Sequence, residues 1–125
     1  MYKLLLIALG GALGTLARYG THVLASGLGE RFAFPVATMT VNLLGCFAIG
    51  FLGGTFDRTA IREEYRLMIL VGFLGGFTTF STFGLDTFRL LREGHVGRGV
   101  LYVLASNMLG IALVFAGYSL SRWRA

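Results

Sequence analysis

The run GFLGGFTTFSTF, residues 72–83, decides how the rest of the chain is interpreted. It lies inside a segment apolar enough to cross a membrane, yet it holds the adjacent glycines Gly75 and Gly76, followed by a cluster of hydroxyl side chains. Each glycine costs about 1 kcal/mol relative to alanine inside a helix. A helix that is interrupted at membrane depth is tolerated only where it is buried in protein or lines a watery cavity. The run therefore predicts a broken helix at a transport site, with the break near Gly75–Thr78.

The composition of the whole chain is that of a membrane protein. Of its 125 residues, 55% are hydrophobic and only 14% are charged, whereas soluble domains carry about 25% charged residues. A span needs about 20 mostly apolar residues, and four segments meet this requirement, at about 3–26, 35–56, 65–91 and 99–120. We therefore expect an all-α integral membrane protein, a single four-helix transmembrane domain over residues 1–125. Short polar loops, including GLGERF at 27–32, would join the spans.

Positive charges are nearly balanced between the two ends of the predicted bundle. With four spans, one end carries Lys3, Arg58, Arg62, Arg66, Arg122 and Arg124, and the other carries Arg31, Arg89, Arg92 and Arg98. Orientation normally follows an excess of Lys and Arg in the cytoplasmic loops, and here the excess is small. Because four short helices also make a bundle too thin to enclose a polar path, we expect an antiparallel, dual-topology homodimer.

The sequence lacks the residue patterns of enzymes and nucleotide-binding proteins. His22 and His95 stand far apart, Cys46 is the only cysteine, and the glycine-rich stretches lack the Lys-Ser/Thr ending of a phosphate loop. We therefore expect no catalytic residue, no organic cofactor and no nucleic-acid partner. The net charge of +5 is interpreted as headgroup anchors and topology signals.

Polar side chains inside the predicted spans are candidates for an ion path. Asn42 lies about a third of the way through the second span, and its amide both donates and accepts hydrogen bonds. The alternative for Asn42 is a structural contact between helices, and the sequence leaves both open. Tyr102 and Ser106 are four residues apart, which places them on one face of the fourth span. Arg18 adds a cationic side chain toward the end of the first span.

The middle of every span lacks a carboxylate, which favours an anion over a cation as the transported ion. Asp86 is the only candidate acid, and Arg89 follows it at a spacing that permits pairing. Phe80 and Phe83 share a face, and the positive edges of their rings can contact a small, hard anion. Broken helices also expose carbonyl groups that coordinate cations, so residues 75–78 are a possible Na⁺ site.

Together with VNLLGCFAIG at 41–50 and GGALGTLARY at 10–19, the run at 72–83 resembles the Fluc (CrcB-type) fluoride channels of bacteria. The resemblance covers essentially the whole chain, with four spans, short loops and the three motifs in order. It implies a multi-pass protein of the bacterial plasma (inner) membrane that exports fluoride passively and selectively. It also implies a dual-topology homodimer with two antiparallel pores.

The resemblance further implies roles for individual residues. The fluoride path would be lined by an amide, two phenyl rings and several hydroxyls, at Asn42, Phe80, Phe83, Ser81, Thr82, Tyr102 and Ser106. Arg18 matches a first-span arginine near an aqueous vestibule that attracts anions. Gly75 and Thr78 match the residues whose backbone carbonyls hold a structural Na⁺ at the dimer interface. Gly110 stands where some relatives carry another hydroxyl.

Two other functions suit a chain of this size. A small multidrug-type exporter requires a glutamate embedded in the first span, and residues 4–17 contain no acidic residue. A non-transporting membrane assembly protein would leave the Gly–Thr–Phe cluster without a role. We therefore expect a fluoride channel whose partners are fluoride, Na⁺, the lipid bilayer and a second copy of the chain.

Overall fold

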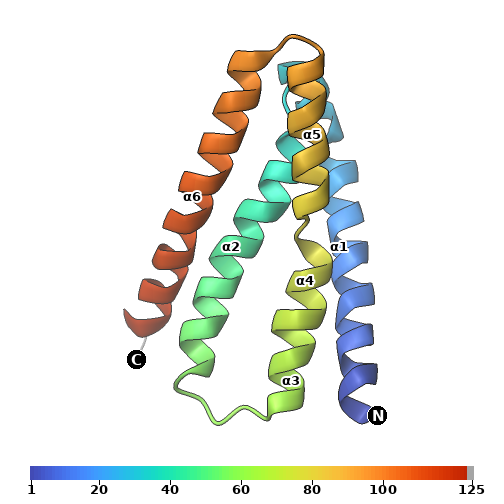
Figure 1. Ribbon diagram of the computed structural model, residues 1–125. Helices are drawn as coiled ribbons and strands as arrows, with labels where there is room; N and C mark the ends of the chain where they lie inside the picture. The colour runs from blue at the N-terminus through green and yellow to red at the C-terminus, as the bar shows by residue number, and fades with distance from the viewer. Residues whose placement is uncertain (124–125) are drawn as a thin grey trace.

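The computed structural model describes residues 1–123, and the regular secondary structure within them is helical. In chain order the elements are α1 (Tyr2–Phe32), α2 (Val36–Phe56), α3 (Glu63–Leu67), the π-helix η1 (Met68–Phe73), α4 (Leu74–Phe77), α5 (Phe80–Arg92) and α6 (Val96–Trp123). The elements α3 to α5 follow one another along one rod (Figure 1). Four stretches are long and apolar enough to cross a membrane, namely Tyr2–Phe32, Val36–Phe56, Glu63–Arg92 and Val96–Trp123. The expectation of an all-α chain with four apolar helices is confirmed. Arg124, which entered the charge balance, lies outside the described residues.

The first connection is shorter than the sequence indicated. Residues 27–32, which we expected to form a polar loop, are the last turns of α1. The prediction was wrong because the two glycines of this segment alternate with good helix formers, which offset their cost. The helix ends with Ala33 in a left-handed conformation (φ 48°, ψ 48°) and its N–H bonded to the Gly29 carbonyl. Pro35 then stands as the N-cap of α2.

The four rods form two close pairs, in which α1 lies along η1 and α4 while α2 lies along α6 (Figure 1). Glycines permit the close approach in both pairs. A Cβ built on Gly14 would lie 2.0 Å from the Phe73 carbonyl oxygen, and one on Gly50 would lie 2.1 Å from that of Val114. Lipid supplies no hydrophobic drive between helices, so such backbone contact is a main source of helix association in membranes. We call the first of these contacts, formed by Gly10, Gly14, Gly72 and Gly76, the α1 seam.

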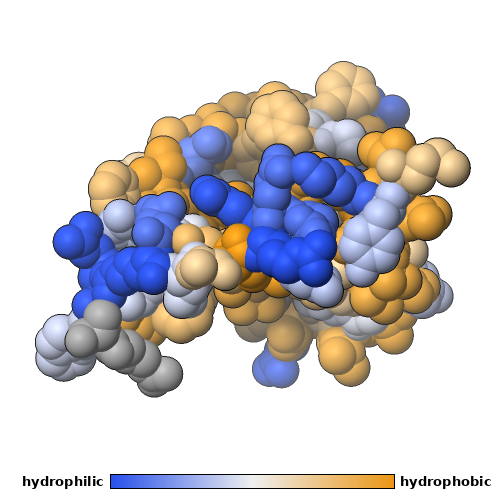
Figure 2. Space-filling model, turned by 90° about the horizontal axis from the view of Figure 1, so that it is seen from below, coloured by the Kyte–Doolittle hydropathy of each residue, from blue (hydrophilic) through white to orange (hydrophobic). Residues whose placement is uncertain are grey.

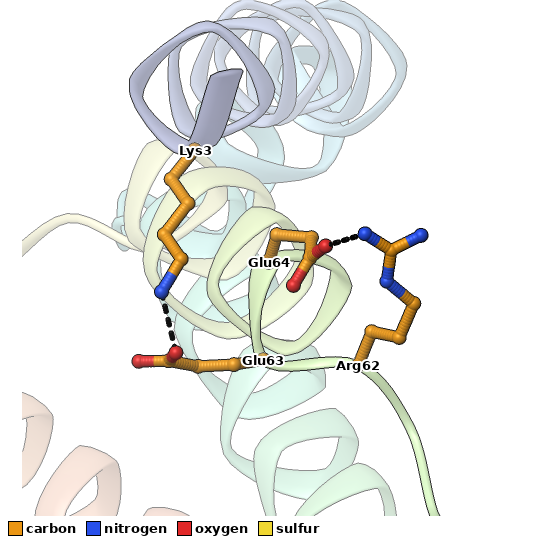
Figure 3. Close-up of polar contacts among 4 residues, drawn as sticks. All are labelled: Lys3, Arg62, Glu63 and Glu64. Carbon is orange, nitrogen blue, oxygen red and sulfur yellow. Dashed lines mark hydrogen bonds and ion pairs between the residues drawn. The ribbon is translucent and has the colours of Figure 1, made fainter. Parts of the chain in front are cut away.

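The N-terminus, the 57–62 loop and the end of α6 lie at the same end of the molecule (Figure 1). Seen from this end, hydrophilic side chains gather near the middle and to one side, with apolar side chains around them (Figure 2). Within residues 1–123 the ion pairs are both here: Lys3 Nζ lies 2.5 Å from Glu63 Oε2, and Arg62 pairs with Glu64 (Figure 3). Lys3–Glu63 joins α1 to α3 with both side chains more than half exposed, so it contributes at most about 1 kcal/mol.

Large apolar side chains cover the outside of the molecule, while few are enclosed. Leu24, Met108 and Phe115 are examples of highly exposed apolar residues on α1 and α6. Among the described residues, Tyr102 and Val41 are the largest side chains that are fully buried. Such an apolar exterior is typical of a chain whose surface meets lipid or another apolar partner.

Candidate functional site

The third rod is interrupted at two threonines. α4 ends at Phe77, α5 begins at Phe80, and Thr78 (φ −80°, ψ 158°) and Thr79 (φ −149°, ψ 114°) are extended between them. Gly75, at which the sequence placed the start of the break, is still helical within α4. The Thr79 hydroxyl accepts the backbone N–H of Thr82 at 3.2 Å and so caps α5, as threonine commonly does at a helix N-terminus.

Asn42 of α2 bonds to both backbone polar groups of Thr79. Its Nδ2 donates to the Thr79 carbonyl at 3.0 Å, and its Oδ1 accepts the Thr79 N–H at 2.8 Å. These two bonds fix the orientation of the amide, because the reverse orientation would set donor against donor. A buried backbone group without a partner costs about 1–3 kcal/mol. Asn42 therefore satisfies both backbone groups of Thr79 at the interruption.

Arg18 reaches the interruption from α1. Its Nη1 donates to the Thr78 carbonyl at 3.2 Å. The side chain is half-buried, and neither of the ion pairs found within residues 1–123 includes it. A cationic side chain midway along an apolar helix without a carboxylate partner is uncommon, and such residues mark ion pathways in membrane proteins.

The end of α4 leaves carbonyl groups that suit a cation. The Thr78 N–H bonds to the Leu74 carbonyl, but the Thr79 N–H is taken by Asn42, so the Gly75 carbonyl loses its helical partner. Within residues 1–123 no other donor reaches the Gly75 carbonyl, and no cluster of three His, Cys, Asp or Glu side chains could hold a metal. Carbonyl oxygens are good ligands for hard cations, and a helix C-terminus carries partial negative charge. The carbonyls of Gly75 and Thr78 therefore fit a Na⁺ ion as part of its ligand set.

An open groove of about 400 Å³ lies beside the interruption, where α2, the third rod and α6 meet. Its walls are Asn42, Gly45, Cys46, Ile49, Leu70, Leu74, Gly75, Thr78, Thr79, Phe80, Phe83, Ser106 and Asn107. Phe80 is 83% exposed, and its ring lies 5.6 Å from that of Phe83 between centroids. Mostly apolar walls with a few placed polar groups are typical of ligand sites. The groove brings together Asn42, Phe80, Phe83 and Ser106, which are far apart in the sequence.

Two hydroxyls of α6 are buried without a hydrogen-bond partner among residues 1–123, Tyr102 Oη and Ser106 Oγ. The Tyr102 ring is completely buried and packs against Phe83, with centroids 5.1 Å apart, and edge-on against Phe34. Most buried polar groups in proteins have a partner. Ser106 lines the groove, so its free hydroxyl is a donor available to a ligand there, while Tyr102 is enclosed behind Phe83.

The structure places Ser81 and Thr82 away from the walls of this groove. The Thr79 hydroxyl donates to Thr82 Oγ1 at 3.0 Å and lies 3.4 Å from Ser81 Oγ, so both side chains belong to the capping network of α5. Thr82 lines a second cavity of about 340 Å³, which also includes His22, Thr38, Asp86 and Arg89. The predicted site residues are thus not gathered in one place: most line the groove, Thr82 lines the second cavity, and Arg18, Ser81 and Tyr102 line neither.

Sequence reasoning missed Thr38, whose Oγ1 donates to Asp86 Oδ2 at 2.7 Å. Thr38 is almost completely buried. Arg89, whose spacing from Asp86 permits pairing, takes part in neither ion pair of residues 1–123. The spacing permits pairing, but in the structure α2 brings the Thr38 hydroxyl to the carboxylate instead. One signal was available, since Thr38 stands four residues before Asn42 and so shares its helix face.

Comparison with known proteins gives matches over nearly the whole chain. The family described as CrcB-like protein, Camphor Resistance (CrcB), matches residues 5–118. The fluoride-specific ion channel FluC of Methylobacillus flagellatus is 42% identical over 121 residues, 96% of this chain and 94% of that protein. The protein of the same name from Salinibacter ruber is 49% identical over 117 residues, 94% of this chain and 87% of that protein. One from Thermus thermophilus is 48% identical over 121 residues, 96% of this chain and 95% of that protein.

Proposed function

The chain belongs to the CrcB-like family, and from this premise we propose that it is a channel for fluoride. The observation that carries the proposal is the groove at the Thr78–Thr79 interruption, where an amide, two phenyl rings and a free hydroxyl converge. The proposed channel is passive and multi-pass. It lies in the plasma (inner) membrane of a bacterium, where it lets fluoride leave and so lowers its concentration in the cytoplasm.

The chemistry of the groove suits a small, strongly hydrated anion. A path for such an ion must replace its water with many weak donors and still release the ion. The edges of Phe80 and Phe83 offer partial positive charge, and the hydroxyls of Tyr102 and Ser106 have no competing partner among residues 1–123. None of the residues that form the walls is acidic, so no carboxylate repels an anion there.

The proposed path uses residues of both cavities. It comprises Asn42, Ser81, Thr82, Phe80, Phe83, Tyr102 and Ser106. In this proposal the rings of Phe80 and Phe83 contact the anion, while the Asn42 amide holds the interrupted backbone beside it. Arg18 contributes positive charge near the vestibule from which the anion enters.

We propose that a second, inverted copy of the chain covers the open side of the groove. A Cβ built on Gly75 would meet nothing within 4 Å, and Phe80 stands out from the surface. One copy therefore supplies only part of the wall. A two-fold axis would pair the same face of both copies, which gives two antiparallel pores. A structural Na⁺ between the copies would be held by the carbonyls of Gly75 and Thr78 from each, at the interruption in the third span.

Ion efflux from liposomes tests the proposed function. Purified protein is reconstituted into liposomes loaded with either fluoride or chloride, with a potassium ionophore to prevent a build-up of voltage. We expect fluoride to leave far faster than from protein-free liposomes and chloride to leave at the protein-free rate. Fluoride efflux at the protein-free rate would show that the proposed function is wrong, and equal efflux of chloride would refute the selectivity.

A further inference from the structure

We propose that Arg18 is a tethered cation that shares the Thr78 carbonyl with the interfacial Na⁺ and thereby lowers the affinity of that site for Na⁺. The inference rests on the proposed function, since it takes the Na⁺ site as given. It starts from one contact, the hydrogen bond from Arg18 Nη1 to the Thr78 carbonyl at 3.2 Å.

Arg18 bonds to this carbonyl because the helix has released it. In a continuous helix the Thr78 carbonyl would accept the N–H of Thr82, but that N–H is turned to the Thr79 hydroxyl. Within residues 1–123, Arg18 is the donor that takes its place. A guanidinium is planar, directional and permanently charged. The carbonyl that is proposed as a Na⁺ ligand is therefore already oriented by a positive charge.

The charge of Arg18 acts on a cation at the same oxygen. A carbonyl oxygen has two lone pairs, so one oxygen can accept the guanidinium and coordinate Na⁺ at the same time. Two unit charges held by one oxygen lie within about 6 Å of each other, and at an effective dielectric constant of about 20 their repulsion corresponds to about a hundredfold in affinity. Glu63 and Glu64 form their ion pairs at the far end of the rod, and Asp86 on α5 accepts the Thr38 hydroxyl. No carboxylate among residues 1–123 therefore forms an ion pair with Arg18.

Removing the positive charge of residue 18 while keeping a hydrogen-bond donor there tests the inference. Arg18→Gln retains an amide N–H and removes the positive charge. The readout is the thermal unfolding of purified protein in detergent at increasing Na⁺, with choline replacing Na⁺ at constant ionic strength. A ligand that binds only the folded state stabilises the protein once the ligand concentration exceeds its Kd. The Na⁺ concentration at half-maximal stabilisation therefore reports the affinity of the site for Na⁺. We expect this midpoint to fall by about tenfold or more in the variant.

Arg98→Gln is the matched control, because Arg98 is an exposed residue at the start of α6 and loses the same charge. Its midpoint should equal that of the unaltered protein. If Arg18→Gln leaves the midpoint unchanged or raises it, the inference is overturned while the Na⁺ site stands. If the unaltered protein shows no stabilisation by Na⁺, the Na⁺ site and the inference are both wrong. Fluoride efflux, measured separately, decides the channel function.

Arg18→Lys keeps the inference testable if the glutamine variant does not fold. A lysine ammonium ordinarily loses its proton near pH 10, so the charge at this position can be removed by raising the pH. The Na⁺ midpoint of this variant should fall between pH 7 and pH 10 relative to that of the unaltered protein, whose arginine stays charged. A midpoint that follows the unaltered protein at both pH values would contradict the inference.

Discussion

The two sides of α4 differ in how closely they are packed. Toward α1 the helix is sealed, since a Cβ on Gly76 would lie 2.5 Å from the Gly11 carbonyl oxygen. Toward the groove it is open, since a Cβ on the adjacent Gly75 would meet nothing within 4 Å. The two neighbouring glycines therefore have different roles. One allows two backbones to touch, and the other leaves room beside an unpaired carbonyl.

The largest effect is expected at the α1 seam, from Gly14→Val. The new side chain would start 2.0 Å from the Phe73 carbonyl oxygen and 2.9 Å from the Phe77 backbone nitrogen, and backbone cannot move aside as a flexible side chain can. We expect a loss of about 3 kcal/mol or more, seen as a loss of monodisperse protein in size-exclusion chromatography. Gly20→Val in the same helix, where a Cβ meets nothing within 4 Å, should keep its yield. Equal yields of both variants would show that the seam is not tightly packed.

The next largest effect is expected from Asn42→Ala, which removes both hydrogen bonds to Thr79. Two backbone groups would lose their partners, at about 1–3 kcal/mol each, so the thermal unfolding temperature should fall by several degrees. Asn107→Ala is the control, because the Asn107 amide bonds only to the Val103 carbonyl of its own helix and is exposed. That variant should stay within about 0.5 kcal/mol of the unaltered protein. A smaller loss for Asn42→Ala than for Asn107→Ala would contradict the bridging role of Asn42.

A medium effect is expected at the second cavity, from Thr38→Val. The change preserves shape and removes the hydroxyl that donates to Asp86, and hydrogen bonds to charged groups contribute about 1.5–3 kcal/mol. Thermal unfolding should show a loss of about 2 kcal/mol. Thr21→Val is the matched variant, because the Thr21 hydroxyl donates to the Ala17 carbonyl of its own helix. If the two variants lose equal stability, the bond to Asp86 has no special value.

The smallest effect is expected from Lys3→Ala, at the exposed ion pair between α1 and α3. The Lys3–Glu63 pair is largely solvated, and such pairs contribute about 0.2–1 kcal/mol. The unfolding temperature should change little, and about 0.5 M salt should remove the remaining difference. A loss as large as that of Thr38→Val would mean that this ion pair, and not the glycine contacts alone, holds α1 to the third rod.

The sequence predicts the helical architecture well because its evidence is local. Apolar runs of about 20 residues identify spans without reference to tertiary contacts. The position of the interruption depends on tertiary contacts instead. Gly76 stays helical where it packs against α1. Thr79, three residues later, is extended, because Asn42 bonds to its backbone and its own hydroxyl caps α5. Intrinsic helix propensity ranks glycine below threonine and so points to Gly75 and Gly76, whereas the extended residues are Thr78 and Thr79.

The candidate site was predictable to the extent that polar residues stand out in apolar spans. Asn42 and Ser106 were selected in this way, whereas Phe80 and Phe83 were selected by their shared helix face, and all four line one groove. The partner of Asp86 was not predictable, because the choice between Arg89 on its own helix and Thr38 on α2 depends on how two helices meet. The bond from Arg18 to Thr78 likewise joins residues 60 positions apart.

Fluoride efflux from Phe80→Ile and Phe88→Ile proteins tests most directly whether the open side of α4 and α5 carries the anion. Both residues are exposed phenylalanines of α5, but only Phe80 lines the groove. With both variants shown to be intact by size-exclusion chromatography, we expect Phe80→Ile to lower fluoride efflux at least about tenfold, equivalent to about 1.4 kcal/mol in the barrier. Phe88→Ile should conduct as the unaltered protein does. Equal efflux from the two variants would remove the groove from the fluoride path.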